Sequence, residues 1–234
     1  NYLAKRDASP ASRDNDRRAI SRFFSWCMER PRRWCMVNPC AVVKVEKPER
    51  TPPSILTVPT CERLMREAEA YKGGKLAPYF AVCLFGGLRP YEAQRLTWNQ
   101  VNLDDREIRL EGNQTKTKRP RTVHLDEPLL SWLKAHKGKP FHPPNFRTDF
   151  RRLLVKIGYG TKSKEHPALQ PWPEDVLRHT CISHFFRKHQ SYGMAAERFG
   201  NSEAIIKEHY QGRVTSTETA AFYNITPSTK GGRK

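Results

Sequence analysis

The spacing of apolar residues predicts a helix near the start of the chain. Between Ser12 and Arg30, apolar side chains recur three and four positions apart and arginines occupy the opposite face, as in an amphipathic helix. A single helix cannot bury its own apolar stripe. We therefore expect residues 1–45 to be the remainder of a small helical module. Because the first residue is Asn1, we expect a fragment whose earlier part is missing.

A change in composition marks the end of this module. From Ala41 to Pro59 the chain turns to Val, Lys, Glu and Pro, which is typical of an extended, semi-rigid linker. We place the boundary near residue 52. The sequence thus predicts a helical module with its linker at 1–52 and a larger domain at 53–234.

Two periodicities alternate in the larger domain. Helical spacing begins at Pro59 and again at Leu76. It returns in three later segments, residues 129–133, 146–157 and 175–186. Short alternating runs around Ile108 and Val123 flank the turn-rich E-G-N-Q-T-K-T-K-R-P, which predicts a small antiparallel sheet. The expected fold is mainly α with one small β-sheet, an α+β arrangement.

The charge balance narrows the choice of partner. The 234 residues include 42 Lys and Arg but only 24 Asp and Glu, a net charge of +18. This excess makes a polyanion the expected partner, with double-stranded DNA first. Both predicted parts are basic, so they would face the same polyanion as a C-shaped clamp. No apolar run approaches the roughly 20 residues of a membrane helix, so no membrane contact is expected.

The cysteines favour a reducing compartment. The six of them lack C-x-x-C spacing and lie mostly in apolar surroundings, so we expect a cytoplasmic protein, associated with the nucleoid through DNA. A metal site would need His179, Cys181 and His184 to converge. On a helix, however, His179 and Cys181 would point about 200° apart, so no metal is expected.

Three basic residues stand in unusual local settings: Arg89 in F-G-G-L-R-P-Y-E, Lys116 in Q-T-K-T-K-R-P-R and Arg178 in D-V-L-R-H-T. Arg89 follows two glycines that end an apolar helix, and Glu92 could orient its guanidinium. A planar fork suits the two non-bridging oxygens of a phosphodiester. The alternative for each residue is an ordinary solvated charge.

Four motifs in order resemble the tyrosine recombinase (phage integrase) family. They are G-G-L-R-P-Y-E-A-Q-R-L-T-W, the K-T-K-R-P-R-T-V-H-L hairpin, L-R-H-T-C-I-S-H and F-G-N-S-E-A-I-I-K-E-H-Y. The resemblance spans residues 55 to about 212. It extends to the first module, because R-R-A-I-S-R-F-F-S-W followed by V-N-P-C is similar to the end of that family's core-binding domain.

The resemblance implies a site-specific recombinase that cleaves and rejoins DNA without a metal or cofactor, through a 3′-phosphotyrosyl ester. Tyr210 matches the nucleophile, and Arg89 and Arg178 match the pair that clamps the scissile phosphate. Lys116 would protonate the departing 5′ oxygen, with Lys118 as a rival. Further basic residues are expected to contact DNA: Arg17, Arg18, Lys118, Arg119 and Arg121. Self-association on DNA as a tetrameric synapse is implied as well.

Two residues depart from the family pattern. Asp175 stands where the family has the His of H-x-x-R, and Asn201 where it has the His of G-H-S. Asp175 could take the tyrosine's proton or pair with Arg178, but its charge would also repel a phosphate. Asn201 can donate a hydrogen bond but carries no charge. We therefore expect a slowed site. An inactive DNA-binding protein and a type IB topoisomerase-like enzyme are the alternative functions.

The remaining candidates are interpreted as structural. His179 is expected to hydrogen-bond within the site, and His184 to lie on the outer face of its helix. Three tryptophans are expected in the core or at its rim: Trp98, Trp132 and Trp172. A short capped helix is predicted near S-T-E-T-A-A-F-Y-N-I, packed either on its own domain or on a neighbouring subunit.

Overall fold

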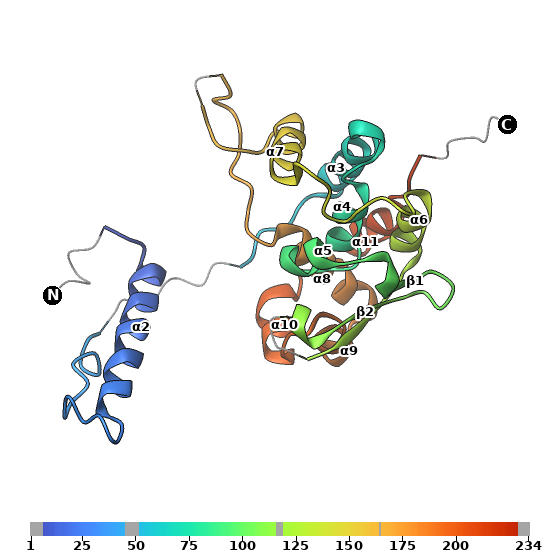
Figure 1. Cartoon of the computed structure of the whole chain (residues 1–234). Helices are drawn as coiled ribbons and strands as arrows, with labels where there is room; N and C mark the ends of the chain where they lie inside the picture. The colour runs from blue at the N-terminus through green and yellow to red at the C-terminus, as the bar shows by residue number, and fades with distance from the viewer. Residues whose placement is uncertain (1–6, 45–51, 116–118, 164, 229–234) are drawn as a thin grey trace. The chain divides into compact units, whose positions relative to one another are not determined.

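The computed structural model describes residues 7–44, 52–115, 119–163 and 165–228 (Figure 1). The chain divides into two compact units, residues 1–52 and 53–234. Within the described residues, no helix is long and apolar enough to cross a membrane.

The first unit contains the predicted amphipathic helix. Helix α2 spans Pro10–Met28, and the side chain of Ser9 caps its start by accepting from the backbone N–H of Ser12. Cys27 is buried, but Phe23 is 56% exposed and Met28 38% exposed. The apolar stripe of α2 is thus only partly covered by the described residues of its own unit.

The second unit begins with α3 (Val58–Ala70) and α4 (Ala77–Leu84), which follow the two predicted apolar runs. The short helix α5 (Pro90–Arg95) comes next and follows no such run. Every residue of α4 is buried, because α3, α6 and α8 all pack around it. Its C-terminus is therefore fixed, and the G-G-L-R turn that follows starts from a rigid support.

A three-stranded antiparallel sheet confirms the predicted β insertion. It consists of β1 (Val101–Asn102), β2 (Glu107–Leu110) and β3 (Arg121–His124) in the order β1-β2-β3. Ile108 pairs with Val123, and both side chains are buried. The short strand β1 was not predicted.

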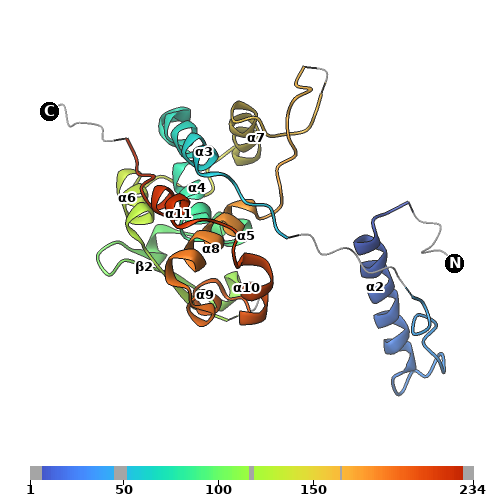
Figure 2. The same cartoon turned by 180° about the vertical axis from the view of Figure 1, so that it is seen from behind.

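Among the described residues after the sheet, the α-helices are α6 (Glu127–Ala135), α7 (Phe146–Lys156), α8 (Val176–His189), α9 (Tyr192–Phe199), α10 (Glu203–Tyr210) and α11 (Ser216–Tyr223). Helix α8 is central, with α11 on one side and α9 and α10 on the other (Figure 2). The mainly α fold with a small antiparallel sheet is confirmed.

Helix α11 covers His184, which the sequence analysis expected on the outer face of α8. It packs on α3 and α8 of its own unit, and Phe222 stacks on His184 with 4.2 Å between ring centroids. His184 is therefore 1% exposed, with Nδ1 bonded to the hydroxyl of Thr219 at 3.1 Å, and not on an outer face. Burial lowers the pKa of His184 to about 4, so the imidazole is neutral at physiological pH.

Candidate active site

Arg89 stands at the turn between α4 and α5. Gly87 has a φ of 63°, and a Cβ there would lie 2.5 Å from the ring of Phe199, so glycine is required on both grounds. Pro90 then opens α5, with Arg89 at the N-cap position. As expected from the motif, this turn holds the Arg89 side chain in a partly buried position, with 21% of the side chain exposed.

Glu92 orients two arginines, Arg89 and Arg121, through hydrogen bonds to its buried carboxylate. Its carboxylate is 1% exposed and accepts from the backbone N–H of Arg89 at 2.9 Å and from Arg89 Nη1 at 3.3 Å. Arg121 on β3 binds the same carboxylate in a bidentate pair at 2.8 and 2.7 Å. Burial alone would raise the pKa of Glu92, but the hydrogen bonds and charge of Arg121 outweigh it and hold the pKa below its usual range.

This pairing gives Arg121 a different surrounding from the one the sequence suggested. Its side chain is 10% exposed and bonded to Glu92, whereas the sequence analysis expected Arg121 to contact DNA. The contact joins the sheet to α5, since Arg121 belongs to β3 and Glu92 to the first turn of α5.

Arg178 lies on α8 and is buried, with 3% of the residue exposed. Its guanidinium donates to the carbonyls of Gly87 and Phe199, and Nη2 also donates to Asn201 Oδ1 at 3.0 Å. Burial lowers its pKa to about 10, and the nearby charges of Arg89 and Arg121 act in the same direction. Arg178 therefore stays protonated near neutral pH.

Asn201 joins the two arginines. Its Oδ1 also accepts from Arg89 Nη2 at 3.4 Å, so both guanidinium groups meet on one amide oxygen. Gly200, at a φ of 64°, ends α9 and places Asn201 there. A neutral acceptor thus stands between two positive charges, where the family pattern has a histidine.

Asp175 does not form the ion pair with Arg178 that helical spacing made feasible. It precedes α8 in the left-handed conformation, with φ 50° and ψ 17°, so the side-chain directions of a continuous helix do not apply to it. Within the described ranges, Arg178 bonds to carbonyl and amide oxygens, and no ion pair involves Asp175. Asp175 instead lines a cleft beside Arg89.

Tyr210 ends α10 with its ring 3% exposed. Its hydroxyl lies 2.7 Å from Nδ1 of His179, which confirms that His179 hydrogen-bonds within the site. Burial raises the pKa of Tyr210 to about 12; Asp175 adds to the rise, while Arg178 and Arg89 oppose it. The phenol is therefore protonated at physiological pH, and it would lose this proton only to a base.

The remaining predicted residues fall into three groups. Lys116 and Lys118 lie outside the described residues, and Arg119 beside them is exposed. On α2, Arg17 and Arg18 both contact Asp14, and the Arg18 side chain is 64% exposed. These two arginines belong to the first unit.

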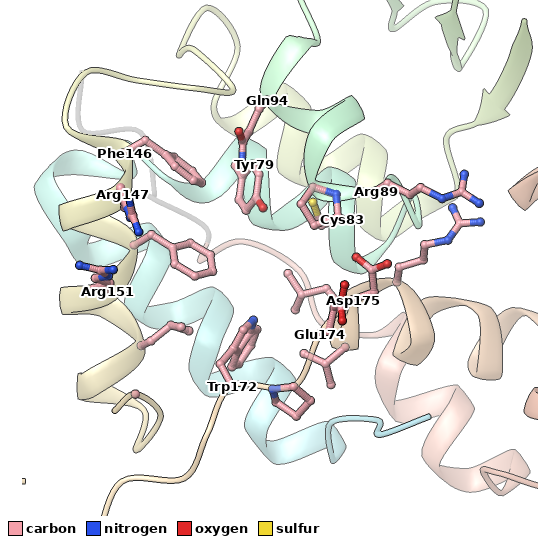
Figure 3. A pocket seen from close by; sticks show the side chains of 18 of the residues that line it. Tyr79, Cys83, Arg89, Gln94, Phe146, Arg147, Arg151, Trp172, Glu174 and Asp175 are labelled. Atoms are coloured by element: carbon pink, nitrogen blue, oxygen red, sulfur yellow. The ribbon is translucent and has the colours of Figure 1, made fainter. Parts of the chain in front are cut away.

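An open cleft of about 1640 Å³ adjoins Arg89 and Asp175 (Figure 3). Phe146, Phe150 and Trp172 line it, and Trp172 is half-buried at its wall. The other two tryptophans also follow expectation: Trp132 is fully buried, and Trp98 is partly buried and packs against the main core.

Two exposed arginines of this cleft were not predicted from the sequence. Arg147 and Arg151 lie on α7, at the side of the cleft opposite Arg89 (Figure 3). The sequence did contain a signal for them. Arg147 and Arg151 are four residues apart and follow the apolar positions Phe146 and Phe150, which places both arginines on one face of a helix.

No described group of three His, Cys, Asp or Glu residues is arranged to hold a metal ion. His179 binds Tyr210 and His184 binds Thr219, so each imidazole has its own partner. All six cysteines are free thiols.

Solved structures share this fold. The Tn1549 transposon integrase (residues 82–397, in complex with a circular intermediate DNA) matches with a TM-score of 0.68 at 17% identity, covering 94% of this chain and 81% of that one. A lambda integrase (75–356) dimer bound to a COC′ core site matches with a TM-score of 0.63 at 17% identity, covering 88% and 76%. The chain therefore shares its fold with these integrases.

The sequence comparison gives the family. Residues 55–211 match the phage integrase family, and the chain belongs to it. It is 27% identical over 181 residues to the integrase of Haemophilus phage HP1, and 22% identical over 223 residues to a putative integrase of Pseudomonas phage Pf1. These matches cover 76% and 94% of this chain. The chain spans about half the length of these relatives, 49% of the first and 60% of the second.

Proposed function

We propose that this protein is a site-specific DNA recombinase, an integrase that breaks and rejoins DNA strands through a covalent bond to Tyr210. Two guanidinium groups meeting on one amide oxygen, Asn201 Oδ1, support this function most directly. Such an arrangement offers several N–H donors and two positive charges to one small anion. A phosphodiester fits this chemistry.

In the proposed cleavage step, each group takes the role that the family resemblance implies. The Tyr210 oxygen attacks the scissile phosphorus, a new O–P bond forms, and the bond from phosphorus to the 5′ oxygen breaks. Arg89 and Arg178 stabilise the charge that develops on the phosphate oxygens, as fixed donors do in other active sites. Lys116 gives a proton to the departing 5′ oxygen. Attack by a new 5′ hydroxyl on the phosphotyrosine reverses these steps and joins the strands.

Double-stranded DNA is the proposed partner. The net charge of +18 would release counterions from several phosphates. Arg147 and Arg151 line the same cleft as Arg89, so a DNA backbone that reaches Arg89 would pass close to both. Arg17, Arg18 and Arg119 supply further phosphate contacts, with the first unit acting as the end of a core-binding domain. Recombination of two duplexes requires self-association on DNA.

Covalent capture tests the function. The full chain is incubated with a library of random-sequence duplexes, each carrying a nick close to the cleavage position so that the released fragment diffuses away. Protein-linked DNA is recovered in SDS and sequenced, and peptides from the adduct are analysed by mass spectrometry. We expect an enriched sequence, nucleotide attached at Tyr210, and no adduct from Tyr210→Phe.

Two results would point elsewhere. DNA binding without any SDS-resistant adduct would show an inactive DNA-binding protein of the same fold. Relaxation of supercoiled plasmid at high dilution, without an enriched sequence among the adducts, would indicate a topoisomerase-like enzyme.

A further inference from the structure

We infer that His179 is the base that takes the proton of Tyr210 during strand cleavage, and that Asp175 assists by stabilising the imidazolium that forms. This inference rests on the proposed recombinase function and assigns a step within it. It moves the proton acceptor from the position of Asp175, three residues before Arg178, to the residue that follows Arg178.

The hydrogen bond identifies the acceptor. The Tyr210 hydroxyl lies 2.7 Å from His179 Nδ1, within the range over which a proton passes between two such groups. For Nδ1 to accept, the neutral imidazole must carry its proton on Nε2. The two rings are tilted by 32° with centroids 5.8 Å apart, so the contact is made through the polar atoms.

The environment keeps both partners in the required form. Burial lowers the pKa of His179 below its usual value, so the ring is neutral and able to accept near physiological pH. Burial raises the pKa of Tyr210 to about 12, so the phenol keeps its proton until it attacks. Among the described residues, only His179 forms a side-chain hydrogen bond with the Tyr210 oxygen.

Asp175 acts on this pair through space. Within the described part of the chain it makes no ion pair and no side-chain cap to α8. The backbone carbonyl of Asp175 accepts a hydrogen bond from the N–H of His179 at 2.9 Å, so the two residues lie one helical turn apart. From this position the carboxylate raises the pKa of His179, which favours the imidazolium produced by proton transfer.

Protons and bonds balance in both directions. As the Tyr210 oxygen bonds to phosphorus and the 5′ oxygen leaves, the phenolic proton moves to Nδ1 and His179 becomes positively charged. When a 5′ hydroxyl attacks the phosphotyrosine, the imidazolium returns that proton to the departing Tyr210 oxygen. No oxidant, metal or further reactant is needed.

Several charged groups surround His179 and must be separated in a test. Beside it on α8 and at the start of that helix are Arg178, which lowers its pKa, and Asp175, which raises it. From α10 and the residues after it, His209 and Arg213 also lower its pKa. Of these neighbours, His209 carries the same imidazole side chain as His179, so His209→Gln is the matched control.

The experiment measures single-turnover adduct formation between pH 5 and 9, using the nicked duplex that the wild-type protein captures. We expect the wild-type rate to rise with pH as His179 loses its proton and then to level off. His179→Gln should lower the plateau by about 10²- to 10⁴-fold and remove this rise. His209→Gln should keep the rise, and Asp175→Asn should move it to lower pH. Duplex affinity should stay within a few fold in all three variants.

Three results would overturn the assignment. The first is His179→Gln cleaving within a few fold of wild type with the same pH profile. The second is loss of the rise in His209→Gln, which would assign it to that residue. The third does not depend on activity: nitrogen-detected NMR of the free protein showing His179 protonated on Nδ1 and not on Nε2. This NMR measurement keeps the assignment testable if His179→Gln fails to fold. A wild-type protein that forms no adduct would refute the recombinase function itself.

Discussion

Removing the buried carboxylate of Glu92 should lower both the stability of the protein and its rate of cleavage. It accepts four hydrogen bonds, two from Arg89 and two from Arg121. Glu92→Ala would leave Arg121 without its carboxylate, although the arginine side chain is only 10% exposed. Arg89 would lose the group that sets its position beside Asn201. We therefore expect losses of both stability and cleavage.

The size of the effect follows from burial. Breaking a buried ion pair by removing one partner costs about 3–5 kcal/mol, because the remaining charge stays desolvated. For a unit of this size each kcal/mol lowers the melting temperature by about 2–4 °C, so Glu92→Ala should lose about 6–20 °C. Thermal and urea unfolding followed by circular dichroism measure both quantities.

Glu127→Ala is the matched control. Arg106 and Glu127 approach to 2.6 Å, as closely as Arg121 and Glu92 at 2.7 Å, but their side chains are 46% and 72% exposed. An exposed pair contributes about 0–1 kcal/mol, so this variant should melt close to wild type. Equal destabilisation by the two substitutions, or a loss below about 1 kcal/mol for Glu92→Ala, would refute the reasoning from burial.

The effect should also depend on pH. The pKa of Glu92 is lowered in the folded protein, so the unfolded chain binds this proton more readily. Stability from the ionised carboxylate is complete above its unfolded pKa of about 4.3, and it is lost as the pH falls through the lower native pKa. The difference in stability between wild type and Glu92→Gln should therefore be constant near neutral pH and shrink in acid.

The other predictions concern cleavage and binding. Tyr210→Phe should abolish the SDS-resistant adduct while gel-shift affinity stays nearly unchanged; a surviving adduct would place the nucleophile elsewhere. Arg89→Ala and Arg178→Ala should each slow single-turnover cleavage by about 10²-fold or more, and rates near wild type would leave them only a positional role. Asn201→Ala should slow cleavage by about 10-fold, because the arginines lose a shared acceptor and each 1.4 kcal/mol corresponds to tenfold. Affinity for random duplex DNA should fall steeply with salt, and an affinity that is flat between low and moderate salt would contradict the phosphate contacts.

Local sequence determined most of the secondary structure. Apolar spacing gave α2, α4, α7 and α8 to within a few residues, and alternation gave β2 and β3, because these patterns depend on neighbours one to four positions away. The two-residue strand β1 carried too little pattern to be predicted. The ordered motifs also named Arg89, Arg178 and Tyr210 as a group.

Tertiary structure alone decided which partners these residues have. Arg89 and Asn201 are 112 positions apart in the sequence, and His179 and Tyr210 are 31 positions apart. No local sequence pattern fixes contacts over such separations. Tertiary packing also contradicted two expectations that were derived from the geometry of one isolated helix. Helix α11 buries His184, and the left-handed backbone of Asp175 removes the ion pair that helical spacing allowed. The sequence determined which charges this protein carries and on which elements, whereas the packing of α4, α8, α9 and α10 determined which of them meet, because burial and hydrogen bonding depend on groups brought together from distant parts of the chain.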